Sequence, residues 1–592
     1  MRDQTANPTT RDTPLIRGMT RLWRGVACEV GASQPLITRV LAARGLRDPE
    51  TAAAFLDPSL KRLHDPSLMP DLDKAAQRLL RALHDREPIA IYGDYDVDGV
   101  TATSILWHTL HALAPDADVR TYVPHRLDEG YGLNEEAIRE LAAAGAKVII
   151  SVDCGVTAIG PARVARECGV DLIITDHHNL PEDEGALPDA YAVVHPRRPG
   201  SRYPFGELCG AGVAFKLAWR AATMAAGGER VSPKVRDVLL EMLPLASMGV
   251  VADVVPLVDE NRVIASWGLP RIRASTLEGL RALVRASGLD GESIDSEAVG
   301  FKLGPRLNAC GRMGHAREAV ELLTTARGAR ASEIAQMLTR KNEERRAVEK
   351  AILDEAIALA EAAGMTRDER RAIVLSRPGW HPGVVGIVCS RLVERFHRPT
   401  ILMGEQDGVC HGSGRSVDGF PLAHAIARCT EYLISHGGHD MAAGLKLQRD
   451  SLDAFVEAFT SVANEAIRPD QLHGRASFDC DATIAELSGD VVRELRRLGP
   501  FGRENPPITL RMPSVRVEGR AQTMGRENLH LSMHVRDANG SRPMRVVGWQ
   551  WGRRVAEFAP GTPLDLLLRP GISTFGGSPR VECELVDALV VR

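Results

Sequence analysis

The chain has 592 residues, 44% of them hydrophobic and 25% charged, which is typical of a globular protein with several domains. Its net charge of −4 provides no overall positive field for nucleic acid. Its ten cysteines are scattered, with no CxxC pair and no zinc-like spacing, so we expect reduced, buried thiols. The N-terminal sequence lacks the apolar core of a signal peptide, and no apolar run reaches the ~18 residues of a membrane span, so we expect a cytoplasmic protein.

The first part of the chain predicts helices, followed by alternating strands and helices. Residues 33–85 show apolar spacing near 3.6. The runs "PIAIYGDYD", "AKVIISVDCG" and "VDLIITDHHN" are short and β-rich, each closes on an aspartate, and helical patterns such as "NEEAIRELAAAG" separate them. This alternation predicts βαβ units and a parallel sheet. Ligands of such sheets bind beyond the carboxyl ends of the strands, where all three aspartate groups fall.

Three aspartates, Asp94, Asp96 and Asp98, alternate at the end of the first run, in "IYGDYDVDGV". Asp-Gly is a common turn signal, so one interpretation is a set of solvated carboxylates at a strand end. The other is a metal site, because close carboxylates raise each other's pKa unless a cation neutralises them. Magnesium and manganese ions prefer such oxygen ligands.

Further candidate ligands follow the next strands. Asp153 closes the second run and the Asp-His-His triplet 176–178 closes the third, so the topology brings both to the same edge. Neutral imidazole is also a ligand for manganese-like cations. Asp253 stands in the apolar "MGVVADVVPL", where, in isolation, a helix cap or a turn is the better explanation.

The remainder of the chain predicts three further parts. Residues 331–364 are charged and free of internal Pro or Gly; they lack the sustained heptads of a coiled coil and predict a helix that links two domains. A second α/β block spans about 370–465. The last part has short alternating runs with frequent Gly and Pro, compatible with an OB-type barrel. From residue 471 onward there are 17 Arg, no Lys and 14 Asp plus Glu, so the positive charge is concentrated at this end.

Together these motifs resemble the DHH phosphoesterase superfamily, and most closely the RecJ family of single-strand-specific 5′→3′ exonucleases. The similarity extends from about residue 35 to the C-terminus and includes "GDYDVDGVTA", "SVDCG", "TDHH", "LCGAGVAFKL", "ASMGVVADVVPL", "GPRLNACGRMG", "GWHPGVVGIV", "GSGRS" and "GGHDMAAG". The resemblance implies an α/β protein with a parallel-sheet DHH catalytic domain, a long connecting helix, a second α/β domain of DHHA1 type and a C-terminal all-β domain of OB type.

We expect five parts with these boundaries. They are an N-terminal helical arm (1–85), the DHH catalytic domain (86–315), the connecting helix (316–364), the DHHA1-like substrate-binding domain (365–468) and the OB-type single-strand-binding domain (469–592).

The resemblance also implies roles for individual residues. It implies two Mn²⁺ or Mg²⁺ ions, with Asp153 as the bridge and Asp94 and His178 orienting the site or contacting the scissile phosphate. The implied metal ligands are Asp96, Asp98, Asp153, His177 and Asp253. Two such cations stabilise the charge that develops on the phosphate and lower the pKa of water.

A second group of residues is expected to bind the DNA strand: Arg126, Tyr131, Asn308, Arg312, Ser413 and Arg415. Arginine with glycine-rich backbone suits a phosphate, because the guanidinium pairs bidentately and exposed N–H groups form an anion nest. In isolation, each arginine is better explained as a surface residue or a member of a salt bridge. His439, in "GGHDMAAG", is explained nearly as well by tight glycine packing, and its contribution stays open.

The expected function is hydrolysis of single-stranded DNA from the 5′ end to 5′-mononucleotides, in DNA repair and recombination. The alternatives are a DHH phosphodiesterase or pyrophosphatase for small substrates, and a non-catalytic DNA-binding scaffold. The long helix and the extra β domain argue against the former, and the intact ligand set argues against the latter. We expect a monomer; whether a single-strand-binding protein or a helicase supplies the strand stays open.

Two tryptophans in the C-terminal domain have two explanations. "VVGWQWGRR" places Trp549 and Trp551 beside Arg553 and Arg554. An OB-type groove grips DNA by neutralising phosphates and stacking bases on exposed aromatic rings. Alternatively, the tryptophans belong to the barrel core, which we expect for at least one of them.

Overall fold

The computed structural model describes residues 15–591 apart from 27–29, 127, 182–186, 229, 538–539, 541 and 575–576. The chain divides into two compact units. We call residues 58–348 and 500–506 the central unit, and residues 1–57, 349–499 and 507–592 the flanking unit. None of the helices in the described part of the chain combines the length and the hydrophobicity that a membrane-spanning helix needs.

The central unit is built on a five-stranded sheet in which every neighbouring pair is parallel. Its strands, in spatial order, are β4 (Val119–Tyr122), β3 (Ile89–Gly93), β5 (Val148–Val152), β6 (Asp171–Thr175) and β7 (Ala192–Val194). β3 and β5 are buried along their whole length, as expected when helices cover both faces of a parallel sheet. The predicted parallel sheet is confirmed.

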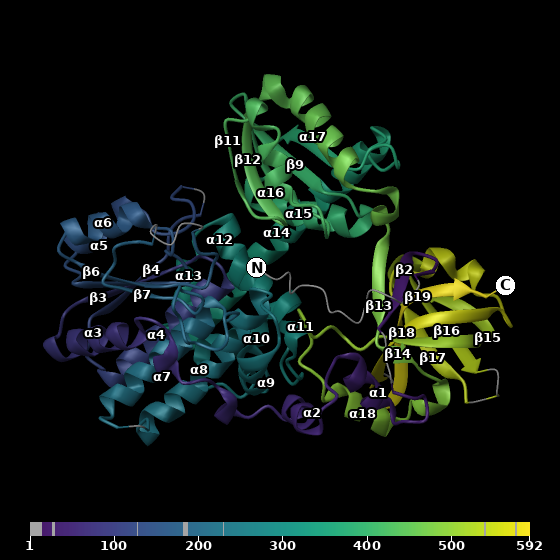
Figure 1. The fold of residues 1–592 in the computed structure, drawn as a ribbon, viewed down its shortest axis with the longest axis horizontal. Helices are drawn as coiled ribbons and strands as arrows, with labels where there is room; N and C mark the ends of the chain where they lie inside the picture. The colour runs from purple at the N-terminus through teal and green to yellow at the C-terminus, as the bar shows by residue number, and fades with distance from the viewer. Residues whose placement is uncertain are drawn as a thin grey trace. The chain divides into compact units, whose positions relative to one another are not determined.

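Helices cover the two faces of this sheet (Figure 1). One face packs on α5 (Glu135–Ala143) and α6 (Ile159–Glu167), whose apolar residues form one core cluster with the sheet. The other face packs on the larger cluster of α3 (Leu72–Asp85), α4 (Val97–Leu113) and α7 (Gly210–Ala225). The sheet is therefore the middle layer of three.

The strand order places the point of reversal between β3 and β5. β3 comes first in the chain, its neighbour on one side is β4, and all later strands lie on its other side. In an open sheet of this kind, a crevice opens beyond the carboxyl ends of the two strands at the reversal. The connections after β3 and β5 carry the aspartates singled out in the sequence.

The central unit continues as an all-helical part. Its helices are α8 (Pro233–Ala252), α9 (Asp259–Ile272), α10 (Glu278–Ala286), α11 (Ser296–Ala298), the π-helix η5 (Val299–Leu303), α12 (Gly304–Met313) and α13 (Arg317–Leu323). The 35-residue helix α14 (Gly328–Ala362) follows, and the division between the two units falls within it, at residues 348 and 349.

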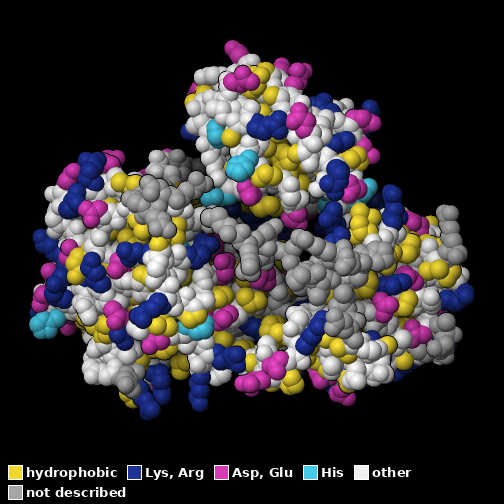
Figure 2. All heavy atoms as spheres, in the orientation of Figure 1, with side chains coloured by type: hydrophobic (Ala, Val, Ile, Leu, Met, Phe, Trp, Pro, Cys, Tyr) yellow, Lys and Arg dark blue, Asp and Glu magenta, His cyan; other side chains and the backbone are white. Residues whose placement is uncertain are grey.

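The flanking unit contains a second α/β part. Its sheet has the order β11-β12-β10-β9-β8, with only the β8–β9 pair parallel. The elements are β8 (Ile373–Pro378), α15 (Pro382–Phe396), β9 (Thr400–Gln406), β10 (Val409–Arg415), α16 (Leu422–Ala427), β11 (Ser435–Gly438), β12 (Ala442–Gln448) and α17 (Leu452–Ala466). Histidine and hydrophobic side chains lie together on one face of this part (Figure 2).

The flanking unit also contains a closed barrel. Its sheet runs β14-β15-β16-β17-β19-β18, and an additional pairing of β15 with β18 closes it. The elements are β14 (Cys480–Asp481), α18 (Gly489–Arg496), β15 (Leu510–Met524), β16 (His530–Asp537), β17 (Met544–Gly548), β18 (Pro563–Ser573) and β19 (Arg580–Val590). Closure, with β17 and β19 parallel, agrees with the predicted OB-type barrel.

The N-terminal segment contains strands that the sequence pattern did not reveal. β1 (Ile16–Arg17) pairs with β2 (Arg21–Gly25), and β2 pairs with β13 (Gly474–Phe478). Trp23 on β2 is fully buried and donates from Nε1 to Asp587 Oδ2 at 2.7 Å. The predicted helices follow as α1 (Leu36–Ala43), α2 (Pro49–Leu56) and α3. β2 instead packs on the barrel, because Trp23 lies in one core cluster with Phe478 and Leu567.

Candidate metal centre

The candidate site lies at the carboxyl ends of β3, β5 and β6. Its acidic and histidine side chains form three overlapping groups, and within each group one donor atom per residue lies within 4.8 Å of the others. The groups are Asp94–Asp96–Asp153, Asp98–His177–Asp253 and Asp153–His177–His178. Asp153 and His177 each belong to two groups. The structure therefore brings all seven predicted metal and catalytic residues into one cluster, with Asp153 shared as a bridging ligand would be.

The loop after β3 is shaped by its own aspartates. Asp96 is the N-cap of α4, where its Oδ1 accepts from the backbone N–H groups of Asp98 at 2.8 Å and Gly99 at 3.1 Å. Asp98, in the first turn of α4, is almost completely buried and accepts from the N–H groups at the N-terminus of α7, Gly210 at 2.6 Å and Ala211 at 2.9 Å. Two helix N-termini therefore hold these carboxylates in place.

Asp153 occupies a strained position directly after β5. Its φ of 63° is in the left-handed region, which is uncommon for a residue other than glycine and typical of functional sites. A Cβ on Gly210 would lie 2.4 Å from Asp153 Oδ1, so only glycine permits this approach of α7. A Cβ on Gly249 of α8 would likewise lie 2.3 Å from Asp98 Oδ1. The glycines make room for the carboxylates.

The carboxylates raise one another's pKa. Burial is the first cause for Asp94, Asp98, Asp153 and Asp253, and the negative charges of neighbouring aspartates are the second for three of them. For Asp253, burial and then Asp98 raise the pKa to about 8. For Asp98, the His177 ring opposes the rise. In the protein alone, this cluster holds more negative charge than its surroundings compensate.

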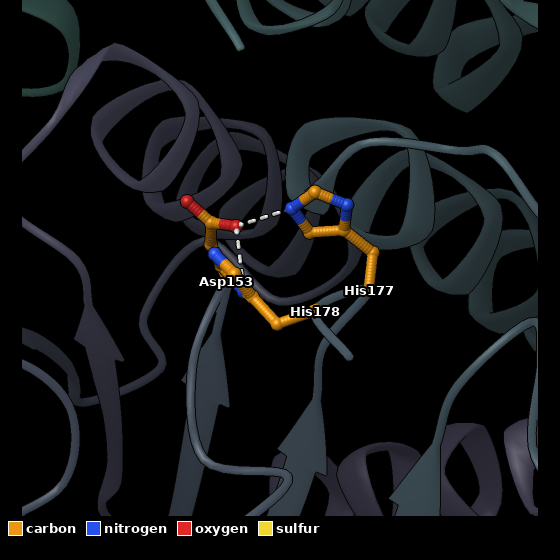
Figure 3. Close-up of side chains that lie close together, drawn as sticks. All are labelled: Asp153, His177 and His178. Carbon is orange, nitrogen blue, oxygen red and sulfur yellow. Dashed lines mark ion pairs between the residues drawn. The ribbon is translucent and has the colours of Figure 1, made fainter. Parts of the chain in front are cut away.

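The His177 ring points toward the Asp153 carboxylate (Figure 3). Its Nε2 lies 3.2 Å from Asp153 Oδ1, 3.5 Å from Asp253 Oδ2 and 3.9 Å from Asp98 Oδ2. Burial lowers the pKa of His177 to about 4, although Asp98 opposes this shift. The imidazole is therefore neutral at physiological pH, which is the form that binds a metal ion.

His178 is held differently from its neighbour. Its Nδ1 lies 2.7 Å from Asp176 Oδ1, and the Tyr131 hydroxyl lies 3.2 Å from the ring. Burial, the largest single cause, lowers the pKa of His178, but the hydrogen bond to Asp176 and the negative charges of Asp176, Asp253 and Asp98 together raise it to about 9. Asp176 itself is buried, which raises its pKa, but hydrogen bonds from the His178 ring and from backbone N–H groups lower it overall. His178 is thus a protonated imidazolium at neutral pH.

The donor set fits divalent cations. Among the described residues, Asp94 Oδ1, Asp153 Oδ1 and His177 Nε2 are buried polar atoms without a hydrogen-bond partner. Leaving such atoms unpaired is costly, and each belongs to the overlapping groups above. Carboxylate oxygens suit magnesium and manganese, and a neutral imidazole is a further ligand for manganese-like cations. The cluster is therefore built around positive charge that the chain does not supply.

Four predicted strand-binding residues lie around the β3–α4 loop. The Arg126 guanidinium stacks on the Tyr95 ring, 4.8 Å from its centroid, and Tyr131 is 55% exposed. Asn308 on α12 accepts from Val97 N at 3.0 Å through its Oδ1, so the oxygen end of its amide holds the β3–α4 loop. Arg312, one turn further along α12, lies close enough to lower the pKa of Tyr95, which burial raises overall.

The remaining predicted residues lie in the flanking unit. Ser413 and Arg415 are on β10, and both approach Gly386 of α15: a Cβ there would lie 3.1 Å from Arg415 Nη2 and 3.3 Å from Ser413 Oγ. They therefore form a small polar cluster of their own. His439 is exposed, and its backbone N–H donates to Ala442 O at 2.8 Å in the tight β11–β12 turn.

Sequence reasoning missed the supporting residues. Asp176 was noted with the two histidines but given no role, and the structure shows that it fixes His178. "LCGAGVAFKL" was noted as a motif, but its function as the N-terminus that binds Asp98 requires the tertiary contact between α4 and α7. The two glycines of that motif were the sequence signal that could have indicated such a close contact.

Comparison with known protein families identifies three matching domains. The DHH family N-terminal domain matches residues 88–243, the DHHA1 domain matches residues 369–465 and the RecJ OB domain matches residues 478–587.

Curated proteins and solved structures agree with these domains. The chain is 38% identical over 558 residues to the single-stranded-DNA-specific exonuclease RecJ of Bacillus subtilis, covering 94% of this chain and 68% of that protein. The crystal structure of Thermus thermophilus RecJ in complex with Mn²⁺ matches with a TM-score of 0.78 and 30% identity, over 96% of this chain and 80% of that one. The same protein in complex with Mg²⁺ matches with a TM-score of 0.72 and 28% identity, over 96% and 78%.

Proposed function

The chain belongs to the RecJ family of single-stranded-DNA-specific exonucleases, and we propose that it degrades single-stranded DNA from the 5′ end, releasing 5′-mononucleotides in repair and recombination. The observation that carries the proposal is the cluster in which Asp153 and His177 are each shared by two groups of metal-ligating side chains. A chain that only bound DNA would have no need of buried carboxylates that repel one another.

We propose that Asp96, Asp98, Asp153, His177 and Asp253 hold two Mn²⁺ or Mg²⁺ ions, with Asp153 between them. Crystal structures of the Thermus relative contain each of these metals. When bound, the ions would supply the positive charge that stabilises the developing charge on the phosphate and makes water nucleophilic at neutral pH. The unpaired buried atoms of Asp153 and His177 support this assignment.

The side chains beside the ligands contribute proton and hydrogen-bond chemistry. His178 carries a proton at neutral pH, because Asp176 holds its ring, and it can donate to an oxygen of the scissile phosphate. The Tyr131 hydroxyl contacts the same ring at 3.2 Å and orients it. Asp94 is buried beside Asp96 and Asp153, so it can position the loop or join the ligands.

The strand is bound by positive charge around the acidic centre. Arg126 and Arg312 flank Tyr95 in the central unit, where a phosphodiester needs counter-charge to approach the carboxylates. In the flanking unit, Ser413 and Arg415 on β10 form the cluster that we assign to the terminal 5′-phosphate. Asn308 has one amide end engaged with Val97, which leaves its NH₂ group for the strand.

We propose that the five parts with boundaries at residues 85, 315, 364 and 468 divide this work. In this division, the DHH part cleaves the phosphodiester bond, the DHHA1-like part recognises the 5′ end and the barrel binds the strand. We also propose a monomer that acts in the cytoplasm, where the family's DNA substrate is available, on strands supplied by a helicase or coated by single-strand-binding protein. Size-exclusion chromatography with light scattering tests the monomer.

The deciding experiment is degradation of end-labelled oligonucleotides. Single- and double-stranded DNA of equal length, labelled at either end, is incubated with Mn²⁺, Mg²⁺ or EDTA. We expect mononucleotides to appear first from the 5′-labelled single strand, with metal only. Degradation from the 3′ end would contradict the polarity, and binding without cleavage under all conditions would favour the scaffold alternative.

A further inference from the structure

Residues 500–506, "PFGRENP", belong to the central unit, although the residues on both sides belong to the flanking unit. The segment connects α18 with β15 of the barrel part. Two contacts fix it on the central unit: Ser296 Oγ donates to Phe501 O at 2.5 Å, and Leu257 N donates to Arg503 O at 2.9 Å. The segment is therefore an ordered part of the unit that carries the metal centre.

Its conformation is tightly defined. Gly502 and Asn505 form a short antiparallel bridge, and the buried Asn505 side chain donates to Pro500 O at 2.8 Å. A Cβ on Gly502 would lie 2.8 Å from the Leu257 side chain, so only glycine allows this approach. Glu504 has a φ of 59°, an uncommon conformation for a residue with a side chain. Such strain is retained where the surroundings impose one geometry.

The segment holds the turn that follows the metal ligand Asp253. Leu257, which donates to Arg503 O, is four residues after this aspartate. Val254, directly after Asp253, has a φ of 57° and is 58% exposed. For a β-branched residue this conformation is an outlier, and strained residues cluster at ligand sites. The turn and the segment thus form one exposed rim beside the metal centre.

Arg503 presents a positive charge on this rim. Its side chain is exposed and, among the described residues, has no ion pair or side-chain hydrogen bond, including none to the neighbouring Glu504. Arg503 also lies within electrostatic range of Asp253, since its charge opposes the rise in the pKa of that carboxyl, which burial and Asp98 dominate. An exposed guanidinium that is not engaged by the protein is available to a ligand.

We propose that Arg503 binds a backbone phosphate of the DNA strand on the Asp253 side of the metal centre. This inference rests on the proposed function. The substrate is a polyanion that must approach a cluster of carboxylates, and the planar guanidinium can pair bidentately with two phosphate oxygens. Arg126 and Arg312 provide positive charge beside the β3–α4 loop, whereas Arg503 provides it beside the end of α8. The strand is thereby held on two sides of the site.

The test compares three full-length variants with the wild type on a long single-stranded oligonucleotide. Arg503→Gln removes the charge, Arg503→Lys retains it without the bidentate geometry, and Arg281→Gln removes an exposed arginine of α10 as a matched control. KM and kcat are measured at several salt concentrations with saturating Mn²⁺. The Mn²⁺-induced rise in the unfolding midpoint reports separately on the metal centre.

We expect Arg503→Gln to raise KM about tenfold, as loss of one charged hydrogen-bonding contact does, with little change in kcat. The slope of log(kcat/KM) against log salt should become shallower by about 0.7, the contribution of one phosphate on a single strand. Arg503→Lys should recover the slope but only part of KM, and Arg281→Gln should resemble the wild type. The Mn²⁺-induced rise in the midpoint should be the same in all four proteins.

Two results would overturn the inference. One is that Arg503→Gln behaves as Arg281→Gln does; the other is that it weakens the Mn²⁺ effect on the midpoint, which would mean that Arg503 acts on Asp253 and not on DNA. A wild-type protein that fails to degrade single strands would instead refute the proposed function, so the two failures are distinguishable.

Discussion

At the carboxyl ends of β3, β5 and β6, buried carboxylates lie next to one another without a positive partner for each. On the barrel, by contrast, most arginines that have a close partner are paired with a carboxylate. In the metal centre, Asp94 and Asp153 each keep a buried oxygen without a hydrogen-bond partner among the described residues. On the barrel the side chains are matched in pairs, which include Arg511–Asp565, Arg536–Glu518, Arg545–Glu582 and Arg554–Glu557. Positive and negative side chains are correspondingly interleaved on its visible face (Figure 2).

The difference shows that the partners of a charge are more informative than the number of charges. An arginine that already pairs with a carboxylate gains little by exchanging it for a phosphate, because both pairings are screened at the surface. A buried carboxylate beside another has no such option, and only a proton or a cation can neutralise it. The 17 arginines from residue 471 onward therefore overstate the positive surface of this segment, whereas the net charge of −4 conceals a strong demand for metal.

The largest effect is expected at Asp153, the proposed shared ligand of the candidate metal centre. Asp153→Asn removes the oxygen charge common to two groups of donors, so we expect activity to fall ~10³-fold or more. The same change relieves repulsion in the metal-free protein, because burial and the neighbouring aspartates raise the pKa of this carboxyl. The unfolding midpoint in EDTA should therefore not fall, while the stabilisation by Mn²⁺ should shrink. Calorimetric scans with and without Mn²⁺ measure both.

The matched control for this change is on the barrel. Asp565→Asn alters another buried aspartate, but one that is paired with Arg511 at 2.7 Å. We expect it to lower the midpoint, because it breaks a pair, and to leave the Mn²⁺ effect intact. Near-normal activity of Asp153→Asn would sink the two-metal assignment.

The next effect concerns the 5′ end of the strand. Arg415→Ala removes the guanidinium beside Ser413 and Gly386, and we expect a loss of roughly 2–5 kcal/mol in binding of a 5′-phosphorylated end if that pair is desolvated. The measurement is kcat/KM for 5′-phosphorylated and 5′-hydroxyl oligonucleotides. The wild type should prefer the phosphorylated strand, and the variant should lose that preference.

Arg449→Ala provides the comparison for this variant. It removes an arginine of the same part of the flanking unit that lies near Glu405, at 3.6 Å, and should keep the preference. If Arg415→Ala reduces the rates on both oligonucleotides equally, Arg415 does not read the terminal phosphate.

Much of the metal centre was predictable because β-strands of a parallel sheet end at one edge. "GDYD", "SVDC" and "TDHH" each follow a short apolar run, so the strand ends alone brought Asp96, Asp153 and His177 together. Asp253 could be assigned only through the family resemblance, because it lies at the end of α8 and no strand pattern places it there.

The parts that were not predictable depend on contacts distant in sequence. β2 pairs with β13, which lies far from it in the sequence. The five residues of β2 carry no pattern long enough to identify a strand. In "VVGWQWGRR", β17 ends at Gly548, where a turn begins, so Trp549 and Trp551 are not on one strand. Likewise, "LGPFGR" was assigned to the barrel by its position in the chain, but residues 500–506 belong to the central unit.

A smaller effect is expected in the pH dependence of stability. The pKa of Asp253 is raised from 3.8 to about 8, first by burial and then by Asp98. A carboxyl whose pKa is higher in the folded protein stabilises it below the unfolded pKa, and this stability is lost as the pH rises through the folded pKa. The metal-free protein should thus become less stable between about pH 4 and pH 8, and Mn²⁺ should reduce the loss. Unfolding midpoints in EDTA and in Mn²⁺ measure it.

Two substitutions test whether the raised pKa of Asp253 causes this pH dependence. Asp253→Asn should flatten the pH dependence in EDTA. Asp470→Asn changes an exposed aspartate whose pKa a hydrogen bond from Arg468 lowers, so its contribution has the opposite sign and the slope above pH 4 should not change. A metal-free protein that gains stability up to about pH 8 would contradict the raised pKa values of the cluster.

The smallest effect concerns the barrel, and the structure determines how it must be measured. Deleting the chain after about residue 468 would remove β13 and Asp587, the partners of β2 and Trp23. Such a truncation exposes a buried tryptophan, so its loss of DNA binding would not be specific. Point substitutions in the full-length protein avoid this problem.

Trp549 and Arg553 are the barrel residues best suited to hold the strand. Trp549 is 52% exposed, whereas Trp551 is buried, as expected for at least one of the two. Arg553 is exposed and has no side-chain partner among the described residues.

We expect Trp549→Ala to weaken binding of long single strands by about 1–3 kcal/mol without changing the salt slope, since stacking involves no ion release. Arg553→Gln should make the slope shallower by about 0.7. Arg536→Gln, which removes an arginine already paired with Glu518, should leave the slope unchanged. Fluorescence anisotropy over a salt series, with EDTA to prevent cleavage, measures all three. Equal slopes for the Arg553 and Arg536 variants would mean that unpaired arginines on the barrel do not contact DNA, and protein partners would then be its more plausible ligands.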